Sequence, residues 1–197
     1  MTHGIAGFLL ANGALDDDDT KTIRQKLIEN DKVEAIIVLP RNMFYSTDIS
    51  VTLWILNNNK KGGMWHGRRL RNRTGEILFI DLRTWSQNIY EKKYVCLTEE
   101  QIADVCKIYF DWQTTRHDQY AKPELYYAAH RKEIAEKGFS LVPSRYIEFV
   151  DRDTEMDYKT ALTEMSKEFE ALKERWNKNE KTLVNAFKVL GYEGENI

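Results

Sequence analysis

Four short runs of apolar residues mark the first half of the chain, at 5–11, 33–39, 51–56 and 77–82. Runs of this length between polar stretches are typical of strands in the interior of a sheet. Asn12-Gly13 after the first run and Pro40 after the second are turn signals that end those strands. We therefore expect four strands, with the runs at 5–11 and 33–39 buried.

A helix is expected between the first two strands, over about residues 21–30. Asp19 or Thr20 can cap it, and the acidic run 16–19 suits the positive end of its dipole. Because neighbouring side chains point in different directions, we do not interpret the four aspartates as a metal site. The residues expected to face the core share a helical spacing and are Ile23, Leu27 and Ile28.

The order strand, helix, strand is typical of an α/β sheet that is covered on both faces. The connection between the second and third strands, 40–50, is short and has no helical pattern. Parallel neighbours need a longer crossover, usually a helix. We therefore predict that the third strand runs antiparallel to the second.

The middle of the chain combines a basic stretch with helical signals. Residues 57–73 are expected to form a polar loop, and its cations are Lys60, Lys61, Arg68, Arg69, Arg71 and Arg73. Thr98 and Gln101 match a capping box, which predicts a helix to about Gln113. The inner face of that helix is expected to consist of Ile102, Val105, Tyr109 and Trp112. A further helix is expected over 124–137.

The tail carries apolar side chains in alternating steps of four and three, at Tyr158, Leu162, Met165, Phe169, Leu172, Trp176, Leu183, Ala186 and Leu190. Asn179 occupies the one polar position of this series. The pattern is a heptad seam, and a helix with so narrow an apolar stripe is expected to pack against another helix. That helix belongs either to another chain, which we favour, or to the same domain if the tail folds back.

Composition narrows the class of protein but does not select a function. Hydrophobic residues make up 42% of the 197, and the formal net charge is −2, so any contact with nucleic acid must come from a local patch. Cys96 and Cys106 are expected to be reduced thiols, with one or both buried. The four histidines have no metal-ligand spacing. Without a leader pattern or a membrane-length apolar run, we expect a soluble cytoplasmic protein with no membrane partner.

Three stretches together resemble a known protein family. They are GIAGFLLANGAL at 4–15, IRQKLIENDKVEAIIVLPRNMFY at 23–45 and STDISVTLWILNNNK at 46–60. They are similar to the distal half of the catalytic domain in the M (modification) subunits of type I restriction–modification systems. GEILFIDLR, LTEEQIADVCKIYFDWQ and GFSLVPSRY further along fit the same family, so the resemblance covers about residues 4–150.

The resemblance implies both a fold and a reaction. Such proteins transfer a methyl group from S-adenosylmethionine to N6 of adenine in DNA. The implied fold class is α/β: the distal part of a Rossmann-like methyltransferase sheet with an antiparallel strand, followed by helices and a long C-terminal heptad helix. Residues 1–150 would then be the C-terminal portion of the catalytic domain. Residues 151–197 would be a helical tail for subunit association, whose contacting residues are Leu162, Met165, Phe169, Leu172, Trp176 and Leu183.

The resemblance also gives Phe44 a role. Enzymes of this family flip adenine out of the duplex and stack it between apolar surfaces. One of these surfaces is an aromatic residue just after a strand that ends in Leu-Pro, and Phe44 matches that position. From the residues alone, burial of Phe44 in the core is the simpler interpretation, whereas the resemblance favours stacking on the target base. Asn42, Tyr45 and Thr47 lie on the same loop and are weaker candidates for DNA contacts.

Two segments that the family uses for catalysis do not occur in this sequence. One is a glycine-rich turn that lets the methyl donor approach the backbone. The other is Asn-Pro-Pro followed by an aromatic residue, and the only prolines here are Pro40, Pro123 and Pro143. We therefore expect the C-terminal part of a subunit, inactive alone and without catalytic residues of its own. S-adenosylmethionine would serve the complete subunit and is not expected to bind this chain.

DNA and a specificity subunit, which reads the DNA sequence in this family, are the implied partners. The basic stretch can contact phosphates through Arg68, Arg69 and Arg71, or it can be a solvated loop. A sheet without its upstream strands has a bare edge, so self-association is also expected, through that edge or through the heptad seam. The alternative function is a non-catalytic interaction module that presents the heptad helix to a partner subunit.

Overall fold

The structure, a computed structural model, describes residues 4–44, 48–88, 95–115, 119–150 and 157–189. The chain divides into two compact units, Met1–Val150 and Asp151–Ile197.

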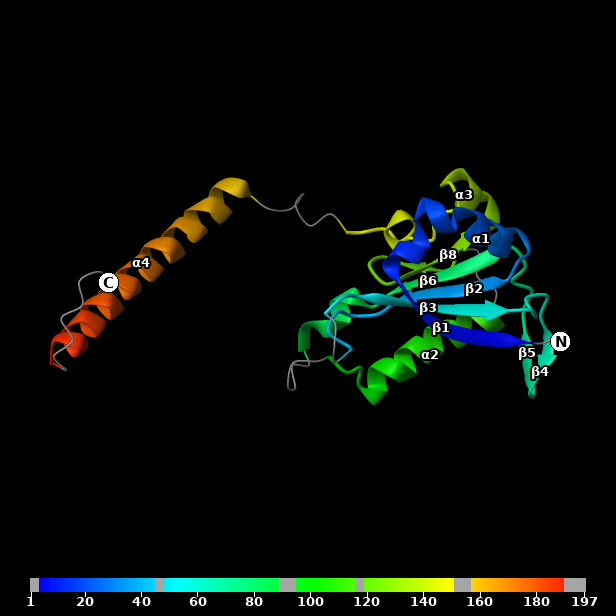
Figure 1. Cartoon of the computed structure of the whole chain (residues 1–197), viewed down its shortest axis with the longest axis horizontal. Coiled ribbons are helices and arrows are strands. Elements are labelled where there is room, and N and C mark those ends of the chain that lie inside the picture. The colour runs from blue at the N-terminus through cyan, green and yellow to red at the C-terminus, as the bar shows by residue number, and fades with distance from the viewer. Residues whose placement is uncertain (1–3, 45–47, 89–94, 116–118, 151–156, 190–197) are drawn as a thin grey trace. The chain divides into compact units, whose positions relative to one another are not determined.

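The first unit is built around a six-stranded mixed sheet (Figure 1). In spatial order its strands are β1 (Ile5–Ala11), β3 (Val51–Asn57), β2 (Val33–Val38), β6 (Glu76–Asp81), β8 (Tyr126–His130) and β7 (Ala121–Lys122). β2 and β6 are parallel, and the other neighbouring pairs are antiparallel. The predicted antiparallel third strand is therefore confirmed. Because β1 and β2 both run antiparallel to β3, the strands β1, β2 and β6 all point the same way.

Helices cover both faces of this sheet. They are α1 (Asp18–Glu29), α2 (Glu99–Thr114) and α3 (Arg131–Glu136), with 3-10 turns at Asn12–Leu15, Arg83–Asn88 and Pro143–Arg145. β2 is buried along its whole length, and its side chains alternate between two cores. Ile36 joins the core that holds Ile28 and Ile134, and Ile37 joins the core that holds Trp112. Thus α1 and α3 lie on one face and α2 on the other (Figure 1).

The helix starts differ in how well the sequence predicted them. The capping box of α2 is confirmed: Thr98 Oγ1 accepts from the Gln101 amide at 3.1 Å, and Gln101 Oε1 accepts from the Thr98 amide at 2.9 Å. In α1 the N-cap is Asp17, which makes no side-chain cap hydrogen bond, so the predicted caps Asp19 and Thr20 are wrong. α1 begins at Asp18, about three residues before the predicted start at residue 21.

Two residues that were predicted to lie on the inner faces of α1 and α2 are exposed instead. Ile23 is exposed, and the neighbouring Arg24 is buried instead. The guanidinium of Arg24 donates to the carbonyl oxygens of Phe139 and Ala14. Such bonds satisfy a buried cation that apolar periodicity cannot reveal. Ile102 at the start of α2 is exposed as well, because the core begins further along that helix.

β1 is a strand, as predicted, but the expectation that it is buried is wrong. All seven of its residues are exposed. β1 lies at the edge of the sheet and pairs only with β3 among the described strands. Phe8 stacks on Trp54, with ring centroids 6.3 Å apart, and is still 36% exposed. The apolar run therefore predicted the strand correctly, but it could not predict how many strands pair with β1 and hence whether β1 is buried.

The helix predicted over 124–137 is a strand followed by a short helix. β8 occupies the first half of this stretch, and α3 begins at Arg131. β8 pairs with β6, with Ala128 opposite Leu78 and Tyr127 opposite Phe79. This pairing buries Ala129 in the core. The tertiary contacts thus outweigh the local helical preference of the two alanines.

The second unit contains α4 (Tyr158–Val189), a continuous helix of 32 residues in which no residue is buried. Within the described ranges, no helix is both long and apolar enough to cross a membrane.

The exposure of the two cysteines in the first unit also differs from the prediction. Cys96 and Cys106 are both exposed, so the expectation that one or both are buried is wrong.

Candidate functional site

The carboxyl ends of β1, β2 and β6 lie at one edge of the sheet, because these strands point the same way. Open α/β sheets bind ligands at this edge. A cavity of about 550 Å³ lies there. Its lining residues come from the ends of these strands and from the residues just before β3, and they are Ala11, Asn12, Gly13, Arg41, Ile49, Ser50 and Arg83.

Phe44 lies in the segment that follows β2 at this edge, although it is not among the residues that line the cavity. The Ser50 hydroxyl donates to the carbonyl oxygen of Leu39 at 2.7 Å, and the Val95 amide donates to that of Asn42 at 2.7 Å. These bonds hold the start of the segment, where Asn42 has a φ of 60°. Asparagine tolerates this left-handed conformation better than most residues do. Asn42 and Phe44 are both half-buried, so Phe44 keeps part of its surface accessible.

Two arginines line the cavity, and each is paired with an aspartate. Arg83 donates from Nε and Nη2 to the two carboxylate oxygens of Asp81, at 2.9 and 2.5 Å. These hydrogen bonds raise the pKa of Arg83, so it stays cationic. The side chain of Asp81 is nearly buried, whereas that of Arg83 is half exposed. Arg41 pairs with Asp48 at 3.3 Å, and both side chains are exposed.

Arg41 and Arg83 were not among the predicted site residues, although the sequence carries a signal for them. Arg41 follows the end of β2 closely, and Arg83 follows the end of β6. Residues that directly follow strands of the same direction meet at one edge of a sheet. The basic stretch 57–73 contains more cations, and the predicted DNA contacts therefore fell there.

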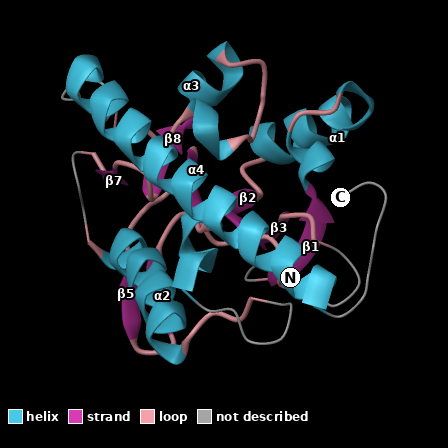
Figure 2. Ribbon diagram, turned by 90° about the vertical axis from the view of Figure 1, so that its left-hand side faces the viewer, coloured by secondary structure: helices cyan, strands magenta, loops and turns pink. Residues whose placement is uncertain are grey.

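The basic stretch lies at the opposite edge of the sheet and is not a loop throughout. It contains a hairpin of β4 (Gly63–Trp65) and β5 (Arg68–Leu70), which lies beside α2 (Figure 2). The stretch follows the end of β3, where the Asn57 amide donates to the carbonyl of Lys32 just before β2. A strand advances about 3.3 Å per residue, so the length of β2 separates the two edges by roughly 20 Å. The structure therefore does not bring Arg68 and Arg69 together with Phe44.

The three arginines predicted to contact DNA have different surroundings. Arg68 and Arg69 are exposed, and the guanidinium of Arg68 lies 4.5 Å from the centroid of the Phe110 ring. Arg71 donates from Nη1 and Nη2 to the carboxylate of Glu76, at 2.9 and 2.7 Å, and also contacts the face of the Trp112 ring. Arg71 is paired with Glu76 and its side chain is only 16% exposed, so the accessible charge of the hairpin is that of Arg68 and Arg69.

Two further cations of the stretch are structural. Lys60 and Arg73 are buried, against the expectation that they belong to a polar loop. Lys60 Nζ lies 2.8 Å from Asp31 Oδ1, and Arg73 Nε lies 3.1 Å from Glu34 Oε1. Burial lowers the pKa of Lys60, and the hydrogen bond and charge of Asp31 oppose that effect. These cations hold the stretch against the start of β2 and are not available to a ligand.

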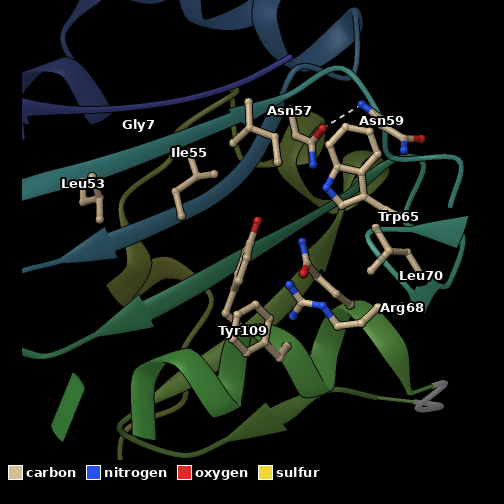
Figure 3. Close-up of a pocket in the computed structure, with 12 residues that line it drawn as sticks. Gly7, Leu53, Ile55, Asn57, Asn59, Trp65, Arg68, Leu70 and Tyr109 are labelled. Carbon is tan, nitrogen blue, oxygen red and sulfur yellow. Dashed lines mark hydrogen bonds between the residues drawn. The ribbon is translucent and has the colours of Figure 1, made fainter. Parts of the chain in front are cut away.

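A second cavity, of about 300 Å³, lies between β1, β3, the hairpin and α2 (Figure 3). Figure 3 shows Tyr109 extending from α2 towards β3, with Asn57 and Asn59 at one end and Arg68 beside α2. Burial, together with the charge of the nearby Glu34, raises the pKa of Tyr109, so its hydroxyl stays protonated. The twelve residues that line this cavity include no carboxylate and no histidine. It therefore lacks groups for acid–base chemistry.

The remaining predicted site residues are not placed together. Tyr45 and Thr47 fall outside the described residues. In the part of the chain that the structure describes, no group of three or more His, Cys, Asp or Glu residues is arranged to hold a metal ion. The tail residues predicted for subunit association are all exposed on α4, and they are Leu162, Met165, Phe169, Leu172, Trp176 and Leu183.

Comparison with known proteins gives consistent matches. A family model described as N-6 DNA Methylase matches residues 1–155. The chain is 29% identical over 193 residues to the type I restriction enzyme MjaIX methylase subunit of Methanocaldococcus jannaschii, covering 96% of this chain and 33% of that protein. It is 34% identical over 150 residues to the HindI methylase subunit of Haemophilus influenzae, covering 74% of this chain and 30% of that protein.

A solved structure shares the fold. The type I restriction–modification system methyltransferase subunit from Streptococcus thermophilus superposes with a TM-score of 0.60 at 23% identity, covering 75% of this chain and 27% of that chain. The chain spans about a third of the length of the curated relatives that it matches. Because the family model covers most of its length, this chain belongs to the N-6 DNA methylase family.

Proposed function

We propose that this chain is part of a site-specific DNA methyltransferase that transfers a methyl group from S-adenosylmethionine to N6 of adenine. Membership of the N-6 DNA methylase family supports the reaction class. In this proposal the chain supplies one wall of the target-base pocket. The observation that carries this assignment is the position of Phe44, half-buried after β2 at the carboxyl edge that also holds Arg41 and Arg83.

Each group at this edge has a distinct task in the proposal. Adenine N6 is inaccessible inside a duplex, so the base must leave the stack and be held by new contacts. Stacking on an aromatic ring supplies about 1–3 kcal/mol per base, and Phe44 offers such a ring. Arg41 and Arg83 hold the phosphates that flank the flipped base. Asn42, in the same segment as Phe44, is a further described residue that we assign to DNA contact.

We interpret the sheet as the distal part of a Rossmann-like methyltransferase sheet, and residues 1–150 as the C-terminal portion of the catalytic domain. Two features support this interpretation: β3 lies antiparallel between β1 and β2, and no strand among the described residues pairs with the outer edge of β1. The methyl donor and the groups that bind the adenine amino group would belong to residues outside this sequence. Alone, the chain is then inactive and does not bind S-adenosylmethionine.

The test of the Phe44 assignment is methyl transfer to DNA. The assay uses this chain together with a specificity subunit and a polypeptide that carries the glycine-rich turn and the Asn-Pro-Pro segment. Phe44→Ala should lower kcat/KM by about tenfold or more, and Phe44→Tyr should retain most of it, because the ring is kept. Phe149→Ala is the control, since Phe149 is an exposed aromatic residue outside the segment that follows β2. Equal activity of Phe44→Ala and the control would exclude Phe44 as the wall.

A second measurement addresses the chain alone. Calorimetry with S-adenosylmethionine should detect no binding in the micromolar range. Micromolar binding would overturn the proposal that the donor site lies elsewhere.

We assign 151–197 to subunit association, with α4 packing against helices of a specificity subunit. The heptad pattern and the exposure of its apolar positions support this role. The chain and a specificity subunit should co-elute in gel filtration, and Phe169→Asp should abolish the complex. If the complex forms but the assembly described above transfers no methyl group, the second candidate function holds: a non-catalytic module that presents α4 to a partner.

A further inference from the structure

The apolar seam of α4 is accessible along the whole described helix. Its large side chains are between 50% and 71% exposed, and they are Tyr158, Leu162, Met165, Phe169, Leu172, Trp176 and Leu183. On a helix, steps of three and four residues keep such side chains on one face. An apolar face of this length must be covered by something in the assembled protein.

The charges of the residues that flank the seam indicate which helix can cover it. In heptad notation, Leu162, Phe169, Trp176 and Leu183 occupy position a, and Tyr158, Met165, Leu172, Asn179 and Ala186 occupy position d. In the middle of the helix, the flanking e positions carry Lys173 and Glu180, and the flanking g positions carry Glu168 and Arg175. All four of these charged side chains are exposed. Charges at e and g decide partner choice and orientation in a coiled coil.

We propose that the helix covering this seam is α4 of a second copy of this chain, in a parallel, in-register, two-stranded coiled coil. The inference rests on the association role proposed above and names the partner. The second copy occupies the seam when no other subunit does.

The charges favour this arrangement over one antiparallel alternative. In a parallel pair, each g residue faces the e residue of the following heptad on the other helix. Glu168 then meets the partner's Lys173, and Arg175 meets the partner's Glu180. Symmetry repeats both attractive pairs. An antiparallel pair centred near residue 174 instead sets Arg175 against the partner's Arg175, and Lys173 against the partner's Lys173.

Asn179 excludes the antiparallel registers that gain an attractive charge pair. Sliding the antiparallel helices by one heptad in one direction brings Glu168 opposite the partner's Arg175, and it sets Asn179 against the partner's Leu162. Sliding them by one heptad in the other direction brings Lys173 opposite the partner's Glu180, which is attractive. The same shift sets Asn179 against the partner's Trp176, where its amide meets an apolar ring and loses its hydrogen bonds to water. In the parallel register Asn179 faces the partner's Asn179, and one amide can donate to the other. A single polar seam position of this kind selects one register.

The length of the helix is sufficient for such a pair. At about 1.5 Å per residue, the 32 residues of α4 extend roughly 48 Å, more than four heptads. The f positions, which face away from the seam, carry Lys167, Glu174 and Lys181 and remain solvated in the pair.

The test uses the full chain and two charge-reversed variants. Variant one carries Lys173→Glu with Glu180→Lys, and variant two carries Glu168→Lys with Arg175→Glu. Each alone sets like charges opposite each other in the parallel pair, so sedimentation equilibrium should show the dimer weakened about tenfold or more. Mixed, the two variants restore every g–e attraction and should form a heterodimer as tight as the original pair. Lys167→Glu with Glu174→Lys is the matched control at f positions and should leave the dimer unchanged.

Each outcome decides the inference. Weakening of both variants with rescue on mixing supports it, because only the parallel register predicts that combination. Variant one dimerising normally overturns it, since the shifted antiparallel register keeps a Lys–Glu pair after the swap. A monomeric original chain also overturns it. A monomer that still binds a specificity subunit would leave the association role of α4 intact. A dimer that does not bind a specificity subunit would contradict the proposed specificity-subunit contact and support the pairing of two copies.

Discussion

Arg73 donates a hydrogen bond from Nε to Oε1 of Glu34 at 3.1 Å, and both side chains are wholly inaccessible to solvent. The same carboxylate oxygen accepts from Gln113 of α2 at 2.9 Å. The other donors of Arg73 go to the carbonyl oxygens of Arg71 and Asn59. One buried cation thus ties the basic stretch to β2, and Glu34 ties β2 to α2.

Replacing Arg73 by Met should destabilise the fold by about 3–5 kcal/mol, because it leaves the Glu34 carboxylate buried without its cation. Urea unfolding followed by circular dichroism measures this change. The double variant Arg73→Met with Glu34→Met removes both charges and should lose less than Arg73→Met alone. A double variant that loses as much as the two single variants combined would show that the two residues act independently.

The Arg71–Glu76 pair predicts an acid-sensitive contribution to stability. Burial alone would raise the pKa of Glu76, but the hydrogen bonds and charge of Arg71, together with the hydrogen bond from Trp112 and the charge of His130, outweigh burial and lower the pKa. A carboxylate with a lowered pKa in the folded state contributes stability above its unfolded pKa, and this is lost as the pH falls through the folded value. Glu76→Gln should therefore cost about 1 kcal/mol at neutral pH, since the pair is partly solvated.

The check for Glu76 is urea unfolding at several pH values. Below about pH 4, where the unfolded-state carboxylate protonates, the gap between wild type and Glu76→Gln should shrink. Glu148→Gln, at an exposed carboxylate, should stay parallel to the wild type throughout. A gap for Glu76→Gln that stays constant down to pH 2 would contradict the assignment.

DNA binding should depend on different arginines at the two edges of the sheet. If the hairpin contacts phosphates, Arg68→Gln with Arg69→Gln lowers affinity and reduces the slope of log affinity against log salt by about 0.9 per lost contact. Arg41→Gln with Arg83→Gln should do the same at the carboxyl edge. Fluorescence anisotropy over a salt series measures both in the assembled enzyme. Lys21→Gln with Lys26→Gln, on the exposed face of α1, is the control, and a pair matching this control does not contact DNA.

The features of the fold that could be predicted from the sequence are those that depend on residues close together along the chain. The strands at 33–38 and 51–57 and the capping box of α2 follow from local pattern, and all three are present. The exposure of β1 does not, because an apolar run is the same whether or not a second neighbour covers it. Stretch 126–130 resembled a helix through its alanines, and only its pairing with β6, distant in sequence, makes it a strand.

The candidate site shows the same division. The position of Phe44 after a strand was visible in the sequence, whereas the grouping of Arg41 and Arg83 required the direction of β6. Lys60, Arg71 and Arg73 counted as loop cations because their partners Asp31, Glu76 and Glu34 are not apparent from composition. The number of cations in the basic stretch therefore overstated how much positive charge is accessible to a ligand.

The opposite placement of Phe44 and the β4–β5 hairpin sets a length scale for substrate. Base pairs of duplex DNA are stacked about 3.4 Å apart, so roughly 20 Å of sheet corresponds to about six of them. A duplex that touches both edges must pass alongside the sheet, and protection from hydroxyl-radical cleavage should then appear as two separate patches. A duplex engaged at the Phe44 edge alone would leave a single patch.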